Sequence, residues 1–179
     1  MSVLTRALSG PSWPIVLILS SLIILAGAHA FEILGDLPPC SLCLRQRDIY
    51  WSAIMMGVVG LALWQHKPSD RFLVALNIML ALVFTTSLVV AAYHAGVEWK
   101  FWQGPSGCSA TGLSNFEDID LLASLDTPKT VIACDEAPWR LFGVSMAGYN
   151  ALLSFALALS SFIAAAHTFS AARQASKDV

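Results

Sequence analysis

Four long apolar segments constrain the fold of this chain more than any other feature. They cover roughly residues 14–33, 45–64, 72–93 and 148–169. A transmembrane helix needs about 20 predominantly apolar residues. Only 12% of the residues are charged, about half the share that is usual in soluble domains. We therefore predict an all-α polytopic membrane protein, a four-helix transmembrane bundle that forms one domain over residues 1–179.

The second segment reaches the length of a span only if its helix has a polar start. The continuous apolar run begins at Ile49, but Arg45, Gln46 and Arg47 precede it directly. Long basic side chains near a helix end can extend to the membrane interface. We therefore expect the second helix to begin near Cys43, with these polar residues at the interface.

The distribution of charge predicts the orientation. Four spans put both termini on one side, and each side carries five Lys and Arg residues. The basic residues on the side of the termini lie in short segments, which weigh most in the positive-inside rule. We predict cytoplasmic termini, with residues 34–44 and 94–147 as outer loops. A cleavable signal peptide ending near residues 28–30 is an alternative, and it would leave the same loops outside. The net charge of −2 gives no indication of nucleic-acid binding.

All four cysteines fall in the two predicted outer loops. Cys40 and Cys43 form a Cys-x-x-Cys motif at the start of the second helix, and Cys108 and Cys134 lie in the long second loop. An even number of cysteines on an exoplasmic face indicates disulfides. A helix N-terminus or a nearby cation lowers a thiol pKa and makes the thiolate available. Arg47, four residues after Cys43 and on the same helix face, is the predicted charge partner of Cys43.

Other interpretations of the cysteines stay open. Four thiolates could form a zinc site, but the 25 residues between Cys108 and Cys134 do not have the spacing of zinc ligands, and we predict no metal. A purely structural disulfide between those two would stabilise the fold by roughly 3–4 kcal/mol in the loop-entropy model. Four cysteines also allow three pairings.

The second outer loop contains one further periodic pattern. Apolar residues recur at three-residue steps over residues 113–125, with acidic residues on other faces. This pattern predicts a short amphipathic helix on the membrane surface. Packing of the same helix on its own protein is equally compatible with the pattern.

Residues 39–47, Pro-Cys-Ser-Leu-Cys-Leu-Arg-Gln-Arg, resemble the Pro-Cys-x-Leu-Cys-x-x-x-Arg signature of the DsbB family of disulfide bond formation proteins. The resemblance extends over the whole chain: four spans, a Cys-x-x-Cys motif in the first outer loop and a second cysteine pair in the next. The segment from Cys134 to Met146 also resembles the lead into the last helix of the family. Ala147 departs from the pattern, because family members often have proline there.

The resemblance implies a quinone-linked thiol oxidase of the bacterial inner membrane, with periplasmic cysteine loops. A reduced thioredoxin-like partner, similar to DsbA, would attack a Cys108–Cys134 disulfide and form its mixed disulfide with Cys108. Cys134 would then pass electrons to a Cys40–Cys43 disulfide. Cys43 would reduce a bound quinone, either ubiquinone or menaquinone, with Arg47 beside it.

His94 is a further candidate for contact with the quinone headgroup. It ends the third predicted span on the outer side, and family members carry a histidine near this point. His29 lies at a similar depth on the first span, so that haem ligation by the two histidines is an alternative. A non-catalytic membrane protein, with outer loops that are stapled by disulfides and bind a partner, is the alternative to an enzyme.

Overall fold

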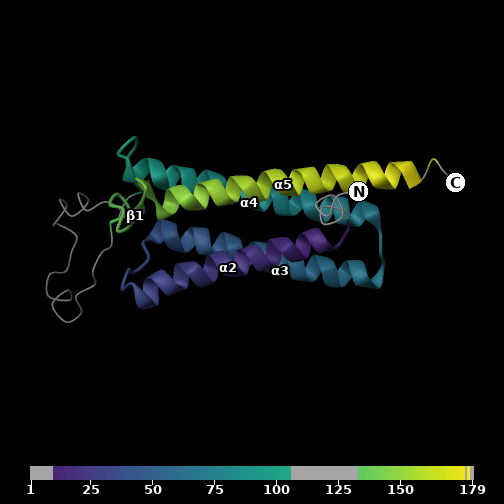
Figure 1. Cartoon of the computed structure of the whole chain (residues 1–179), viewed down its shortest axis with the longest axis horizontal. Helices are drawn as coiled ribbons and strands as arrows, with labels where there is room; N and C mark the ends of the chain where they lie inside the picture. Colours follow the sequence, from purple (N-terminus) through teal and green to yellow (C-terminus); the bar gives the residue numbers. More distant parts are fainter. Residues whose placement is uncertain (1–9, 106–132, 176, 178–179) are drawn as a thin grey trace.

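Four long helices lie side by side in an elongated bundle (Figure 1). The computed structural model describes residues 10–105, 133–175 and 177. In chain order, the helices are α2 (Ser12–Leu34), α3 (Ser41–His66), α4 (Asp70–Glu98) and α5 (Met146–Ala175).

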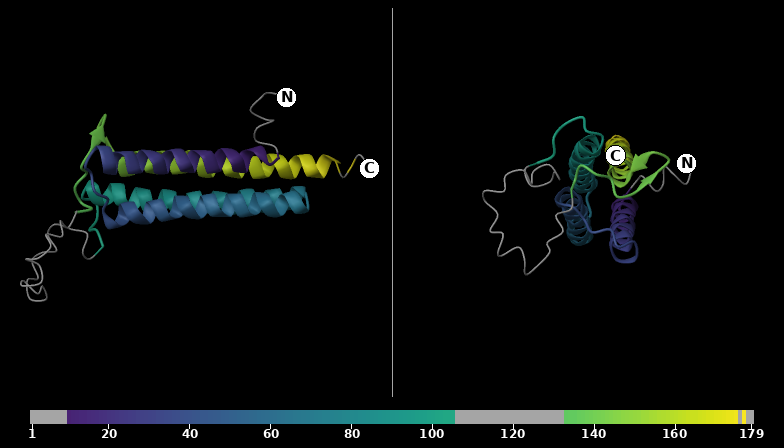
Figure 2. Two further views of the ribbon diagram at one scale, coloured as in Figure 1. Left: turned by 90° about the horizontal axis from the view of Figure 1, so that it is seen from below. Right: turned by 90° about the vertical axis from the view of Figure 1, so that its left-hand side faces the viewer.

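Consecutive helices run in opposite directions, and each packs beside its neighbours in the chain (Figure 2). The most extensive packing is between α4 and α5. The short connection from α3 to α4 lies at one end of the bundle. The opposite end holds residues 35–40, 99–105 and 133–145, and is called the cysteine end below.

Each apolar segment of the sequence lies within one of these helices. By length and composition, α2, α4 and α5 are able to cross a membrane. Helix α3 has 26 residues, which is long enough, but polar residues at both of its ends reduce its mean hydropathy. All four helices expose large apolar side chains, for example Ile23, Leu63, Val89 and Leu152. Such outward-facing apolar surface is suited to contact with lipid.

Helix α3 begins two residues before Cys43, close to where the sequence predicts its start. Pro38 and Pro39 precede it, and the chain from Asp36 to Cys40 is not helical. Proline lacks an amide proton and pushes the preceding residue away from helical angles. Cys40 consequently becomes the N-cap residue in an extended conformation, and its sulfur accepts a hydrogen bond from the Cys43 amide.

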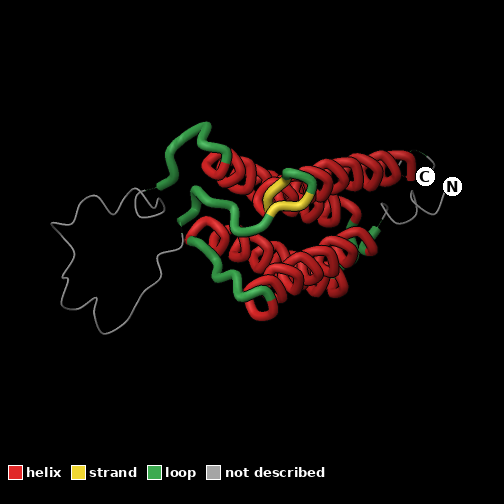
Figure 3. Tube along the Cα trace, turned by 60° about the vertical axis from the view of Figure 1, so that its left-hand side comes forward, coloured by secondary structure: helices red, strands yellow, loops and turns green. Residues whose placement is uncertain are grey.

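A small hairpin precedes α5 and adds to the all-α architecture that the sequence predicts (Figure 3). Strand β1 (Arg140–Leu141) pairs antiparallel with β2 (Val144–Ser145). Phe142 and Gly143 form the turn with φ values of 50° and 82°. Positive φ at both central residues is the geometry of a tight hairpin turn that matches strand twist. The hairpin directs the chain into α5, where the Ser145 hydroxyl accepts a hydrogen bond from the Gly148 amide.

The bundle core consists of apolar side chains from all four helices, with Tyr50 and Phe84 among the largest. Their rings contact each other with centroids 6.1 Å apart. The amphipathic helix predicted over residues 113–125, together with Cys108, lies outside the described residues.

Gly60 provides a test of the close packing between α3 and α4. A Cβ atom at this position would lie 2.4 Å from Leu76 Cδ1 and 2.8 Å from its Cδ2. We predict that Gly60→Ala destabilises the protein by about 1–3 kcal/mol, the usual cost of overpacking. Thermal unfolding of the purified protein in detergent measures the change.

The matched control is Gly27→Ala in α2, where an added Cβ meets nothing within 4 Å. Alanine is favoured over glycine within a helix by roughly 0.5–1 kcal/mol, so this variant should be at least as stable as the parent. Equal unfolding temperatures for the two variants would contradict the packing described for Gly60.

Candidate active site

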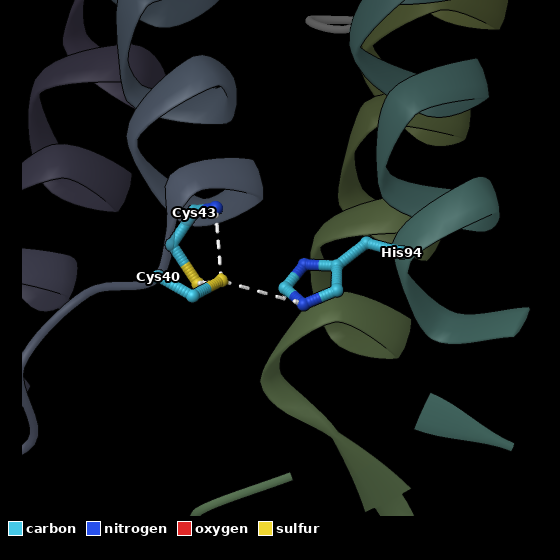
Figure 4. A group of neighbouring side chains, drawn as sticks. All are labelled: Cys40, Cys43 and His94. Carbon is cyan, nitrogen blue, oxygen red and sulfur yellow. Dashed lines mark hydrogen bonds between the residues drawn. The ribbon is translucent and has the colours of Figure 1, made fainter. Parts of the chain in front are cut away.

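Cys40 and Cys43 lie side by side at the start of α3, facing His94 of α4 (Figure 4). Both cysteines are free thiols, and their Sγ atoms are 3.0 Å apart. A disulfide has a sulfur–sulfur distance of about 2.05 Å. The pair is thus reduced in this structure, and a small movement of the sulfurs suffices to join them.

The site favours a thiolate on Cys40. Its buried sulfur lies 3.0 Å from the Cys43 sulfur and accepts a hydrogen bond from the Cys43 amide over 3.3 Å. A thiolate on Cys40 has no proton to give, so it accepts from the Cys43 thiol as well. His94 Nε2 lies 3.6 Å from the same sulfur. The bond from the Cys43 thiol and then the bond from His94 lower the pKa of Cys40 to about 4, although burial opposes this shift. The sequence predicts the thiolate on Cys43 instead, whereas the N-cap position favours Cys40.

Arg47 has a different partner from the one expected. Its guanidinium forms an ion pair with Glu32 of α2 and donates to the Ala28 carbonyl over 3.1 Å. A third contact joins Arg47 Nη1 to His29 Nδ1 over 3.5 Å. The i+4 spacing does bring Arg47 to the side of Cys43, but the carboxylate of the neighbouring helix takes the guanidinium. Among the described residues, His94 therefore takes the place expected for Arg47 and stabilises the Cys40 thiolate together with the thiol and amide of Cys43.

Cys134 packs directly against this pair, although more than 90 residues separate it from Cys43 in the sequence. It is almost completely buried, at 1% exposure, and it takes part in a disulfide. Its Sγ lies 3.7 Å from the Ser41 hydroxyl at the start of α3. The fold thus brings a reduced pair and an oxidised cysteine together at the cysteine end. Cys108 lies outside the described residues.

A largely apolar cavity of about 480 Å³ adjoins the thiol pair. All four helices contribute to its lining, as do residues 37–40 and 133–147. A mostly apolar slot with a few polar groups is typical of a small-molecule site. The side chains along its wall that carry charge or redox chemistry are Cys40, Cys43, Arg47, His94, Glu98 and Glu136.

Several polar residues of the site are missed by sequence reasoning. Gln46 and Asn150 are hydrogen-bonded to each other, and Gln46 also contacts His94. Glu98 accepts a hydrogen bond from Ser145, and its other oxygen is 3.8 Å from His94 Nε2. The sequence feature that could have identified these residues is their polarity within or beside a predicted span. Polar residues in membrane helices usually face the bundle interior and serve function.

The same cluster has some of the features of a metal site. Ligand atoms of Cys40, Cys43 and His94 lie within 4.8 Å of one another. Thiolate and imidazole are zinc ligands, but structural zinc takes four, and the described residues offer three in this group. We interpret the cluster as a redox pair with an adjacent histidine.

Comparison with known proteins decides the family. The family model for disulfide bond formation protein DsbB matches residues 11–164. The chain belongs to the DsbB family. A DsbB family relative, a disulfide bond formation protein B from Dechloromonas aromatica (strain RCB), is 30% identical over 145 residues, covering 79% of this chain and 84% of its own. An uncharacterised protein from Rickettsia prowazekii (strain Madrid E) is 27% identical over 148 residues, or 80% of each chain.

No solved structure matches this chain. Membership of the DsbB family makes it a membrane-bound disulfide bond formation protein and implies thiol–disulfide oxidoreductase activity. This activity agrees with a buried cysteine pair that carries a stabilised thiolate, because thiolates are the species that undergo exchange.

The reactivity of Cys40 tests the description of the thiolate. The pKa of Cys40 is lowered from 9.0 to about 4, so the thiolate persists between these values and is lost only as the pH falls through the lower one. We predict that Cys40 is alkylated well below neutral pH. His94→Leu should raise the pKa of Cys40 by roughly one to two units, because a hydrogen bond to a charged group is lost. Mass spectrometry of alkylated protein over a pH series gives both values, and an unchanged profile in the variant would contradict the role of His94.

Metal analysis distinguishes the redox pair from a zinc site. We predict that the reduced protein, equilibrated with excess zinc and then dialysed, retains far less than one ion per chain. Stoichiometric zinc that is lost in Cys43→Ser would identify a metal centre instead. Inductively coupled plasma mass spectrometry provides the measurement.

Proposed function

We propose that this chain is a protein-dithiol:quinone oxidoreductase. It reoxidises a soluble periplasmic thioredoxin-like protein, similar to DsbA, and passes the electrons through two cysteine pairs to a membrane quinone. One observation carries the proposal: the reduced Cys40–Cys43 pair packs against the disulfide-bonded Cys134 and also lines an apolar cavity.

The proposed location is the bacterial inner membrane, with four spans, cytoplasmic termini and a periplasmic cysteine end. Disulfides persist in oxidising compartments such as the periplasm, which supports this orientation of the cysteines. Helix α3 would be a span in addition to α2, α4 and α5. Arg45 near its N-terminus is exposed at the cysteine end, where a basic side chain can reach the interface.

The first half of the reaction is thiol–disulfide exchange at the soluble side. A partner thiolate attacks the proposed Cys108–Cys134 disulfide, bonding to Cys108 and releasing Cys134 as a thiolate. Cys134 attacks the oxidised Cys40–Cys43 pair, and the second thiol of the partner displaces Cys108, which bonds again with Cys134. The partner leaves as a disulfide, and Cys40 and Cys43 are left as thiols. The redox pattern of the structure, with Cys134 bonded and the other pair reduced, corresponds to this stage.

The second half takes place beside the cavity, where the residues suit a quinone. The lining is mainly apolar, and Arg47 and His94 are the groups that would hold quinone oxygens there. Ubiquinone or menaquinone, when bound, would accept the two electrons and two protons that leave the thiol pair. Cys40 is held as a thiolate by His94, and Cys43, which also lines the cavity, is the proposed electron donor. The sulfurs need only close their 3.0 Å separation to form the disulfide again.

Quinone reduction by the purified protein tests the proposal. A reduced thioredoxin-like dithiol protein serves as donor, and absorbance follows ubiquinone or menaquinone analogues. We predict turnover that disappears when any one of Cys40, Cys43, Cys108 or Cys134 is changed to alanine. Arg47→Gln should slow it by about tenfold or more, since a positioned charge beside a reacting oxygen typically contributes strongly.

Arg45→Gln is the matched control, because Arg45 is exposed two residues away from Arg47 and does not line the cavity. Turnover in this variant should equal that of the parent. If folded, disulfide-bonded protein reduces neither quinone class, the result favours the alternative function. In that case the chain is a non-catalytic protein whose disulfide-linked outer loops bind a partner.

A further inference from the structure

A chain of buried and part-buried hydrogen bonds runs from His94 into the interior of the bundle. Gln46 Nε2 lies 2.9 Å from His94 Nδ1, and Asn150 donates from Nδ2 to Gln46 Oε1 over 2.5 Å. Tyr50 donates its hydroxyl proton to Asn150 Oδ1 over 2.6 Å. The chain therefore joins α4, α3 and α5 directly beside the thiol pair.

Two serines extend the chain beyond Tyr50. Ser154 Oγ lies 3.0 Å from the Tyr50 hydroxyl oxygen and 2.9 Å from Ser87 Oγ. Tyr50 is 2% exposed, and both serines are fully buried. A buried polar group that loses its partner costs about 1–3 kcal/mol, so each member of this chain is constrained to point in the direction that satisfies its neighbours.

The direction of the chain determines where His94 carries its proton. An amide nitrogen can only donate and an amide oxygen can only accept, whereas a neutral imidazole has one donor and one acceptor nitrogen. Because the nitrogen of Gln46 faces Nδ1, Nδ1 is the acceptor and the ring proton lies on Nε2. That proton faces the sulfur of Cys40 at 3.6 Å.

Reversing one member of the chain does not give an acceptable alternative. If the Gln46 amide turned over, its nitrogen would meet the Asn150 nitrogen, donor against donor. Turning Asn150 as well would bring its nitrogen to the Tyr50 oxygen, and the tyrosine proton would then have to point toward Ser154. In the structure Tyr50 instead donates to Asn150, and Asn150 donates to Gln46. This direction of the chain places the proton of His94 on Nε2.

We propose that Gln46, Asn150 and Tyr50 are positioning residues that hold His94 as the Nε2-protonated tautomer, so that a neutral imidazole donates to the Cys40 sulfur. The proposal deepens the proposed function, because it rests on the Cys40–Cys43 pair being the redox centre. It concerns residues that act through His94 and do not contact the sulfurs themselves.

Other ionisable groups around Cys40 come from every neighbouring element. The sulfur of Cys43 in α3 lies 3.0 Å from that of Cys40 and can donate only to a Cys40 thiolate, and Cys134, before α5, is held in a disulfide. Glu98 of α4 already accepts from Ser145, and its second oxygen lies 3.8 Å from Nε2, beyond hydrogen-bond reach. Arg47 is paired with Glu32. The imidazole proton is therefore left for the sulfur.

The test uses intact protein with Cys40 and Cys43 reduced, without quinone or partner. Nitrogen-15 NMR of labelled histidine, assigned with His94→Gln, reports the tautomer, and ultraviolet absorbance reports the thiolate. The parent should show a protonated Nε2. Asn150→Leu removes the donor to Gln46 and lets that amide turn, so Nδ1 should gain proton occupancy. The thiolate-to-thiol ratio should fall about tenfold, as expected for losing one hydrogen bond to a charged group.

Two further variants make the result decisive. Tyr50→Phe removes one hydroxyl from the far part of the hydrogen-bonded chain and replaces Asn150→Leu in the test if that variant does not fold. It should shift the tautomer and the thiolate ratio in the same direction as predicted for Asn150→Leu. Asn77→Leu is the matched control, since this fully buried amide of α4 has no hydrogen-bond partner among the described residues; it should leave both readouts unchanged.

A parent protein with the proton on Nδ1 would overturn the proposal. The proposal would also be overturned if both Asn150→Leu and Tyr50→Phe had the same tautomer and the same thiolate-to-thiol ratio as the parent protein. Neither readout depends on turnover. Failure of the protein to reduce quinone would therefore contradict the proposed function without affecting this result.

Discussion

The contact between Cys40 and His94 is the interaction on which the rest of the site depends. A buried anion is unfavourable unless hydrogen bonds compensate for its lost hydration, and the Cys40 sulfur has three such contacts within 3.6 Å: the Cys43 thiol, the Cys43 amide and His94. The first two exist because Pro38 and Pro39 end the preceding segment and make Cys40 the N-cap of α3. The third joins α3 to α4 and makes the thiolate a property of the folded bundle.

The position of this pair suits the proposed use of two cysteine pairs. A soluble dithiol protein works in water, whereas a lipid-soluble acceptor reaches the bundle from the membrane. Cys40 is buried and Cys43 half-buried, so neither is well placed to meet a soluble partner directly. Cys134 packs against them from the segment before α5, and the apolar cavity adjoins the same pair. The proposed relay of two pairs would let one largely buried centre serve both environments.

Much of this architecture was predictable from the sequence, and the exceptions share one physical cause. Apolar runs and the Cys-x-x-Cys motif indicate the helices and the start of α3, because these are local properties. The partners of Arg47, Gln46 and Asn150 depend on which faces of different helices meet. Gln46 and Asn150 are 104 residues apart, and no local pattern connects them. The Phe142–Gly143 hairpin was missed because each of its strands has only two residues, too few to show alternation.

In the proposed reaction, electrons pass from Cys134 to the Cys40–Cys43 pair. Oxidised protein, freed of quinone, would be mixed rapidly with a reduced thioredoxin-like donor, quenched in acid, alkylated and mapped by mass spectrometry. The account predicts that labelled Cys134 appears first and only transiently, and that label then accumulates on Cys40 and Cys43 until they match the reduced pair of the structure. Label that remains on Cys134, while Cys40 and Cys43 stay oxidised, would contradict the relay.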